Sequence, residues 1–241
     1  MKLDLAIPTY NEAAIIGKTI TTLAGVLNSD KNLSWKIIVA DNGSNDGTAE
    51  KVREISIPNV EAFIVSGKGK GRAIREVAAQ SQAEYFGFID ADLSAEPTAI
   101  FGLLGELSSG ADVAIGSRLK DERVVSRGFF RTLSSKIFNF LRKILVGVRV
   151  ADSQCGLKIM NAEGKKRLLA TVESAWFMDL EFLAYAERDK LVIKEIPVKW
   201  NEFRYENRKP KLNVLRDGVL AIIAMVRIRG RLAKKYAKRS V

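Results

Sequence analysis

The sequence predicts an α/β protein built on a mostly parallel sheet flanked by helices. Five short apolar segments alternate with stretches whose apolar residues recur at helical spacing: residues 3–7, 36–40, 60–65, 85–90 and 112–116. Such alternation is typical of strands joined by right-handed helical crossovers in a parallel sheet. Polar residues follow four of these segments directly. Because parallel sheets bind ligands at the carboxyl ends of their strands, we expect a site along that edge.

The strands and helices follow from local signals in chain order. Pro8 stops the first strand, Asp41 ends the second, and a glycine-rich basic loop, residues 66–71, follows the third. The fourth strand is apolar enough to be buried on both faces. Helices are expected at residues 11–27, from residue 48, and at residues 72–83 and 97–107.

The chain after Arg118 changes to two amphipathic segments rich in basic residues. In the first, one face holds Phe130, Leu133, Ile137, Phe140 or Leu141, Ile144 and Val148, and another holds Arg131, Ser135, Asn139 and Arg142. The second, residues 214–228, is followed by a basic tail. Each segment is either a core-facing surface helix or a helix lying in a membrane interface with its cations at lipid phosphates.

Composition restricts the chemistry. The 241 residues carry a formal charge of +11, which predicts an anionic partner such as nucleic acid, acidic lipid or a phosphorylated ligand. With no histidine and one cysteine, Cys155, the chain has no His base, no internal disulfide and no Cys-rich zinc site. The longest clean apolar run, residues 219–226, is too short to span a bilayer. We expect a protein that is soluble or lies on a membrane surface.

Two carboxylates one residue apart, Asp90 and Asp92, are the strongest sign of a functional site. They flank Ala91 at the end of the fourth strand, where burying them unpaired would cost too much. All-oxygen ligands suit a hard divalent ion, Mg²⁺ or Mn²⁺, that also holds a diphosphate. The alternative is an Asp-rich turn without a ligand.

Polar clusters at four strand ends should meet at one edge of the sheet. They begin at Pro8, Asp41, Gly69 and Asp90. A nucleotide needs such a group, because an acid or amide reads the base, glycines admit the phosphates, and a metal with a lysine offsets their charge.

These clusters resemble the motifs of family 2 glycosyltransferases with the GT-A (Rossmann-like) fold. The matching stretches are Pro-x-Tyr-Asn-Glu from Pro8, Asp-Asn-Gly-Ser-x-Asp-Gly-Thr from Asp41, Gly-x-Gly-x-Ala from Gly69, and Asp-Ala-Asp from Asp90. Within the family, the chain looks like polyprenol-phosphate sugar synthases over nearly its whole length. Residues 152–158, 176–181 and 195–200 are most similar to dolichyl-phosphate glucosyltransferases, which favours UDP-glucose over GDP-mannose as donor.

The resemblance implies a role for each matching residue. Nucleotide-sugar binding falls to Pro8, Tyr10, Glu12, Asp41, Lys70, Asp90, Ala91 and Asp92, with Asp90 and Asp92 also holding the metal. Glu12 could instead cap the first helix. Asp90, Asp92, Arg118 and Gln154 are the candidate catalytic residues, and Arg118, Arg127, Arg131 and Lys211 the candidates for the acceptor phosphate. Pro210 stands where the subgroup has serine.

The implied activity is inverting transfer of a hexose to a polyprenyl or dolichyl monophosphate. A phosphate acceptor is already ionised and needs no strong base, which fits a chain without histidine. The implied domains are a GT-A catalytic domain at residues 1–212, with an amphipathic insertion at 126–149, and a basic amphipathic helix and tail at 213–241. We expect peripheral attachment to the cytoplasmic face of a membrane, or a cytoplasmic protein.

Two alternatives stay open. One is a family 2 transferase acting on a hydroxyl of a glycan, protein or glycolipid, which needs a carboxylate base such as Asp179 or Glu181. The other is a nucleic-acid-binding protein, although the sequence shows no aromatic-basic RNA motif.

Overall fold

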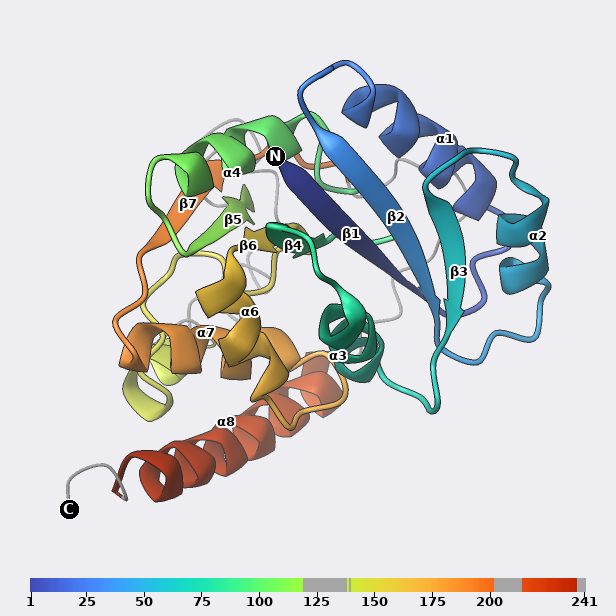
Figure 1. The fold of residues 1–241 in the computed structure, drawn as a ribbon. Helices are drawn as coiled ribbons and strands as arrows, with labels where there is room; N and C mark the ends of the chain where they lie inside the picture. Colours follow the sequence, from blue (N-terminus) through green and yellow to red (C-terminus); the bar gives the residue numbers. More distant parts are fainter. Residues whose placement is uncertain (119–137, 139, 202–213, 238–241) are drawn as a thin grey trace.

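A computed structural model describes residues 1–118, 138, 140–201 and 214–237. In these residues seven strands form one sheet, in the order β3-β2-β1-β4-β6-β5-β7 (Figure 1). The strands are β1 (Lys2–Thr9), β2 (Ser34–Asp41), β3 (Val60–Ile64), β4 (Tyr85–Phe88), β5 (Val113–Ser117), β6 (Lys158–Met160) and β7 (Ile193–Pro197). The predicted α/β class and mostly parallel sheet are confirmed.

One strand runs against the others. β6 pairs antiparallel with both β4 and β5, while the other neighbouring pairs are parallel. The five predicted strands therefore point the same way, and their carboxyl ends share one edge. The antiparallel β6 starts at that edge, which brings the preceding loop, residues 152–157, to the same place.

Helices cover both faces of the sheet. One face packs against α1 (Ile16–Leu27), α2 (Thr48–Glu54) and α4 (Ala99–Ser108), and the other against α3 (Lys70–Gln80), α6 (Ala162–Leu169), α7 (Met178–Arg188) and α8 (Val214–Ala237) (Figure 1). The strands supply side chains alternately to the two sides. In β1, for example, Leu5 and Ile7 enter the first core and Ala6 the second.

Several helix boundaries differ from the sequence prediction. α1 begins at Ile16 rather than residue 11, because residues 11–15 form turns in which the carbonyl of Glu12 accepts from the N–H of Ile15 and Ile16. α3 begins two residues earlier than expected, at Lys70. α8 continues to Ala237, so much of the expected basic tail is helical.

The first amphipathic segment is described only in part. Residues 140–145 are helical. Val148 is buried as predicted and Leu141 packs against the core, but Phe140 and Ile144 are exposed and Arg142 is buried, contrary to the predicted faces. The reason is that the Arg142 guanidinium donates to the carbonyls of Val148 and Ala151 at the turn that follows. The division of the chain at residue 212 stays a prediction. α8 packs its Met225, Ile228 and Leu232 into the core.

Candidate active site

The part of the edge where the sequence predicted nucleoside binding is formed by two loops that hydrogen bonds join. Asn11 N–H donates to the Ser44 hydroxyl at 2.9 Å, and Glu12 N–H to the Thr48 hydroxyl at 2.9 Å. Asp41, buried at the end of β2, accepts from the N–H of Ser44 at 3.2 Å and from its hydroxyl. These hydrogen bonds hold the loop after β1 against the loop after β2.

Two of the predicted nucleotide-binding residues lie where β1 runs into the first loop. Pro8 is half-buried within β1, and Tyr10 is exposed just beyond its end. Lys68 Nζ lies 5.6 Å from the Tyr10 ring centre, so the glycine-rich loop reaches the same rim. The fold thus brings together Pro8, Tyr10, Glu12 and Asp41, which the sequence assigned to nucleotide binding, at the carboxyl ends of β1 and β2.

The Asp-x-Asp motif follows β4 in a strained turn. Ala91 is buried, Leu93 has a φ of 49°, and Ser94 N–H donates to Asp92 Oδ1 at 3.0 Å. A left-handed leucine is uncommon and costs free energy, and such strain clusters at functional sites. Gly156 packs directly on Asp90, since a Cβ there would lie 2.0 Å from Asp90 Oδ2.

Lys70 is held against the motif by the glycine-rich loop. Its Nζ lies 2.7 Å from Asp90 Oδ1, and Trp176 covers it at 5.6 Å. Burial alone would lower the pKa of Lys70, but the carboxylates of Asp90 and Asp179 outweigh burial and raise it. Lys70 is therefore a fixed cation beside the Asp-x-Asp motif. Gly69 permits this placement, with a φ of 131° and its N–H donating to Asn42 Oδ1 at 2.8 Å.

The residues present suit a divalent ion that would be bound jointly by protein carboxylates and a substrate diphosphate. Asp90 and Asp92 offer carboxylate oxygens on one turn, and within the described residues no group of three or more His, Cys, Asp or Glu gathers as a complete cage. Mg²⁺ is typically bound by one or two carboxylates, substrate phosphates and water. Two carboxylates next to a fixed lysine match that donor set.

Arg118 and Gln154 lie further along the sheet edge, on the side of the Asp-x-Asp motif away from the β1 and β2 loops. Arg118 follows β5, and Gln154 is in the loop before β6. The Arg118 guanidinium forms a fork with Asp152, with Nε–Oδ2 at 2.7 Å and Nη2–Oδ1 at 2.8 Å, and it stacks on Trp200 at 4.7 Å. This pairing raises the pKa of Arg118 against the effect of its burial. Gln154 N–H donates to Asp152 Oδ1 at 3.3 Å. Arg118, which the sequence assigned to the acceptor phosphate, thus uses two of its guanidinium N–H groups to bind Asp152. Arg127, Arg131, Lys211 and Pro210 lie outside the described residues.

Two acids considered as bases for a hydroxyl acceptor are occupied in the interior. Asp179 Oδ1 lies 2.6 Å from Nζ of the fully buried Lys158. Glu181 is fully buried; it accepts from the N–H of Val172 and Glu173 and pairs with Arg231 at 2.7 Å. Both carboxylates form buried ion pairs that hold the interior together. The sequence motifs did not indicate that Asp179 pairs with Lys158.

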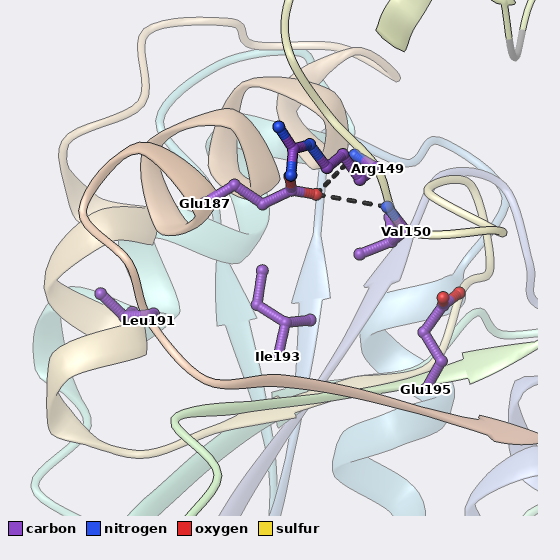
Figure 2. Close-up of a pocket in the computed structure, with 6 residues that line it drawn as sticks. All are labelled: Arg149, Val150, Glu187, Leu191, Ile193 and Glu195. Carbon is purple, nitrogen blue, oxygen red and sulfur yellow. Dashed lines mark hydrogen bonds between the residues drawn. The ribbon is translucent and has the colours of Figure 1, made fainter.

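A hollow lies beside residues 149 and 150, in the segment that leads to Asp152 (Figure 2). It has a volume of about 350 Å³ and is lined by Arg149, Val150, Glu187, Leu191, Ile193 and Glu195. Glu187 Oε1 accepts from the N–H of Arg149 and Val150, and Glu195 accepts from Ala151 and Asp152 at 2.7 and 3.0 Å. These two acids therefore fix the backbone that leads to and includes Asp152.

A mostly parallel sheet with two carboxylates, a fixed lysine and two hydrogen-bonded polar loops along one edge is the arrangement expected of a nucleotide-dependent transferase. The chain belongs to glycosyl transferase family 2, whose family model matches residues 4–169. It is therefore a glycosyltransferase. It is 30% identical to the dolichyl-phosphate beta-glucosyltransferase of Saccharomyces cerevisiae over 83% of this chain and 67% of the relative. It is 29% identical to the Homo sapiens enzyme of the same name, over 90% and 72%.

Solved structures with the same fold include two sugar-phosphoglycerate synthases. Mannosyl-3-phosphoglycerate synthase from Rubrobacter xylanophilus has a TM-score of 0.70 at 18% identity, over 98% of this chain and 75% of that one. Glucosyl-3-phosphoglycerate synthase from Mycobacterium tuberculosis, solved with Mn²⁺, UDP-glucose and phosphoglyceric acid, has a TM-score of 0.66 at 18% identity, over 95% and 80%. The predicted GT-A fold is confirmed.

Proposed function

We propose that this protein transfers glucose from UDP-glucose to a dolichyl or other polyprenyl monophosphate at a membrane surface, with inversion at the anomeric carbon. GDP-mannose is the alternative donor. The names of the yeast and human relatives support a dolichyl phosphate acceptor and a β-linked glucose. Family 2 membership supports inversion.

The donor occupies the edge from the nucleoside loops to the Asp-x-Asp turn. Pro8, Tyr10 and Glu12 line the nucleoside and Asp41 accepts from a base N–H. Asp90 and Asp92 would hold Mg²⁺ or Mn²⁺, which neutralises charge on the leaving diphosphate. The support for these roles is their convergence on one edge.

The chemistry needs an oriented anion rather than a base. An acceptor phosphate oxygen forms a bond to C1 from the face opposite the diphosphate, and the bond from C1 to the UDP oxygen breaks with its electron pair going to UDP. No proton has to leave the acceptor. Arg127, Arg131 and Lys211 stay predictions for holding the acceptor phosphate, with Arg118 contributing whatever Asp152 leaves free.

The observation that carries the choice of acceptor is the state of Asp179. A hydroxyl acceptor needs a carboxylate that can take a proton. Asp179 is buried against Lys158 at 2.6 Å, and Glu181 is buried against Arg231. Neither can meet an acceptor hydroxyl, which favours a phosphate.

A patch on α8 supports attachment to a membrane surface. Its exposed apolar side chains are Val219, Leu220, Ile222, Ile223 and Val226, and Arg227 and Arg229 are exposed beside them. An apolar face bordered by cations suits an interface with anionic lipids. In the described part of the chain, no helix has the length and apolarity needed to cross a bilayer. We assign the cytoplasmic leaflet to this patch as part of the proposal.

The acceptor is tested by offering two lipids that differ only in the phosphate. Purified protein, Mn²⁺ and labelled UDP-glucose are incubated with polyprenyl phosphate or with polyprenol. The proposal predicts organic-soluble label from the phosphate alone, and Asp179→Asn should reduce it only as far as it reduces folding. Label from polyprenol, abolished by Asp179→Asn in a folded variant, would establish the hydroxyl alternative instead.

A further inference from the structure

Arg231 connects α8 to the loop between α6 and α7, residues 170–177. Its Nη2 lies 2.6 Å from Oε1 of Glu173, in that loop, and its Nε lies 2.7 Å from Oε1 of the fully buried Glu181, in α7. Burial alone would lower the pKa of Arg231, but the hydrogen bond to Glu173 and the charge of Glu181 outweigh burial and raise it. One charged guanidinium thus bridges two carboxylates, because it offers two donors in a fixed fork.

The loop is also held by its backbone. Glu181 Oε2 accepts from the N–H of Val172 at 2.8 Å and from the N–H of Glu173 at 2.7 Å. From the other side, the Arg75 guanidinium of α3 donates to the Thr171 hydroxyl at 3.1 Å and to the carbonyl of Glu173. The loop is therefore fixed between α7 and α3, and the side chain of Glu173 is its link to α8.

The same loop packs on the first turn of α3, which carries Lys70. Arg72 N–H donates to the carbonyl of Ser174 at 3.2 Å. A Cβ at Gly71 would lie 2.7 Å from the carbonyl oxygen of Glu173, so the two backbones approach closely there. Because these contacts are close and involve the backbone, a displaced loop would displace the start of α3 with it.

Lys70 is the residue through which these contacts reach the Asp-x-Asp motif. Its Nζ lies 2.7 Å from Asp90 Oδ1, and its side chain is only 14% exposed. Trp176, from the same loop, lies over the ammonium at 5.6 Å. The attraction between a lysine and a diphosphate falls with their separation, so the effect of Lys70 on a ligand at this motif depends on its position.

We propose that Arg231 is a positioning residue for the donor site: through the loop at Glu173 it keeps Lys70 beside the Asp-x-Asp motif. The inference rests on the proposed function, because the ligand that Lys70 would meet there is the diphosphate of a nucleotide sugar. It gives α8 two roles. The helix whose exposed apolar face is proposed for the membrane also fixes the position of a cation in the donor site.

The test asks whether the loop acts on nucleotide binding through Lys70. Binding of UDP with Mn²⁺ to the full chain is measured by calorimetry for wild type, Glu173→Ala, Lys70→Met and the double variant. Glu173→Ala leaves the buried pair of Arg231 and Glu181 in place and should weaken UDP binding about tenfold, a size usual for residues that act through a network of contacts. Lys70→Met should weaken it at least as much. The double variant should bind no worse than Lys70→Met, because the loop then has no lysine to position.

Two conservative variants separate contact from charge. Glu173→Gln loses the same charge as Glu173→Ala but keeps an oxygen that Arg231 can donate to, and it should bind UDP within about twofold of wild type. Arg231→Lys should bind UDP as weakly as Glu173→Ala, because a single ammonium pairs with the buried Glu181 and releases the loop. It also serves as the second test variant if Glu173→Ala does not fold.

Additive losses in the double variant would overturn the inference, because the loop would then act on binding by another route than Lys70. Unchanged UDP binding in both Glu173→Ala and Arg231→Lys would overturn it as well. A wild-type protein that binds no nucleoside diphosphate would instead overturn the proposed donor site. Hydrogen exchange then decides the positioning by itself: the Arg72 amide should exchange faster in Glu173→Ala, with the amides of β1 and β2 unchanged, and equal exchange at Arg72 would overturn it.

Discussion

The buried pair of Lys158 and Asp179 should dominate the stability of the site. Lys158 Nζ lies 2.6 Å from Asp179 Oδ1, 2.6 Å from the carbonyl of Cys155 and 5.4 Å from the Phe88 ring centre, and Lys158 is fully buried. At an effective dielectric constant of 20 the ionic attraction is about 6 kcal/mol. Desolvation offsets part of this, but removing one partner leaves the other charge buried.

Lys158→Met should therefore lower the free energy of unfolding by about 3–5 kcal/mol. For a chain of this size that corresponds to about 6–20 °C in melting temperature. Urea unfolding followed by far-UV circular dichroism measures the loss. The double variant Lys158→Met/Asp179→Leu should recover most of it, because an apolar pair of similar volume leaves no charge unpaired.

An exposed ion pair would give a different result, a loss of at most about 1 kcal/mol. A Lys158→Met variant within that range would refute the reasoning. So would a double variant that is less stable than Lys158→Met alone, since the two side chains would then not act as a pair.

Three further predictions concern the turn, the thiol and the helix. Gly156→Ala should abolish transfer and weaken Mn²⁺ binding measured by calorimetry, because its Cβ would overlap Asp90, while a retained circular dichroism spectrum shows that the fold survives. Cys155 should resist alkylation at pH 8 and react once urea is added. Because its pKa is raised to about 11 in the folded protein, the thiol stabilises the fold fully below its unfolded pKa of about 8.5, and this contribution is lost as the pH rises toward about 11. The difference in unfolding free energy between wild type and Cys155→Ala should therefore shrink over that range. Val226→Glu should reduce sedimentation with anionic vesicles about tenfold and leave nucleotide binding unchanged.

The sequence predicted the sheet because its signal is local. Each of the five predicted strands is a short, mainly apolar run, and polar residues such as Asp41 and Asp90 end several of them; the direction of these strands then follows from helical crossovers. β6 and β7 were not predicted. β6 is three residues long and antiparallel, and nothing in its neighbourhood marks a reversal of direction. β7, Ile193–Pro197, carries Lys194 and Glu195 within five residues and so lacks the apolar run that marked the other parallel strands.

The site was predictable where motifs sit on strand ends and not where residues meet through packing. Asp90, Asp92, Lys70 and Asp41 follow from position alone. Arg118 pairs with Asp152, 34 residues away in the sequence, and Asp179 pairs with Lys158, 21 residues away. These separations do not predict the pairs, because the contacts depend on how the segments pack in the folded protein. Arg142 was assigned to the wrong face because carbonyls, rather than solvent, satisfy its charge.

The most direct measurement of the account is a donor panel with polyprenyl phosphate and Mn²⁺ or Mg²⁺. Labelled UDP-glucose, GDP-mannose and other nucleotide sugars are each incubated with wild type and with Asp92→Ala, and the label that enters the organic phase is counted. We expect one main donor, UDP-glucose, with product lost in Asp92→Ala and unchanged in Ser81→Ala, a substitution at the C-terminal end of α3, away from Lys70. Lipid product at wild-type rate from Asp92→Ala, or no lipid product from any donor despite nucleotide-sugar hydrolysis, would contradict it.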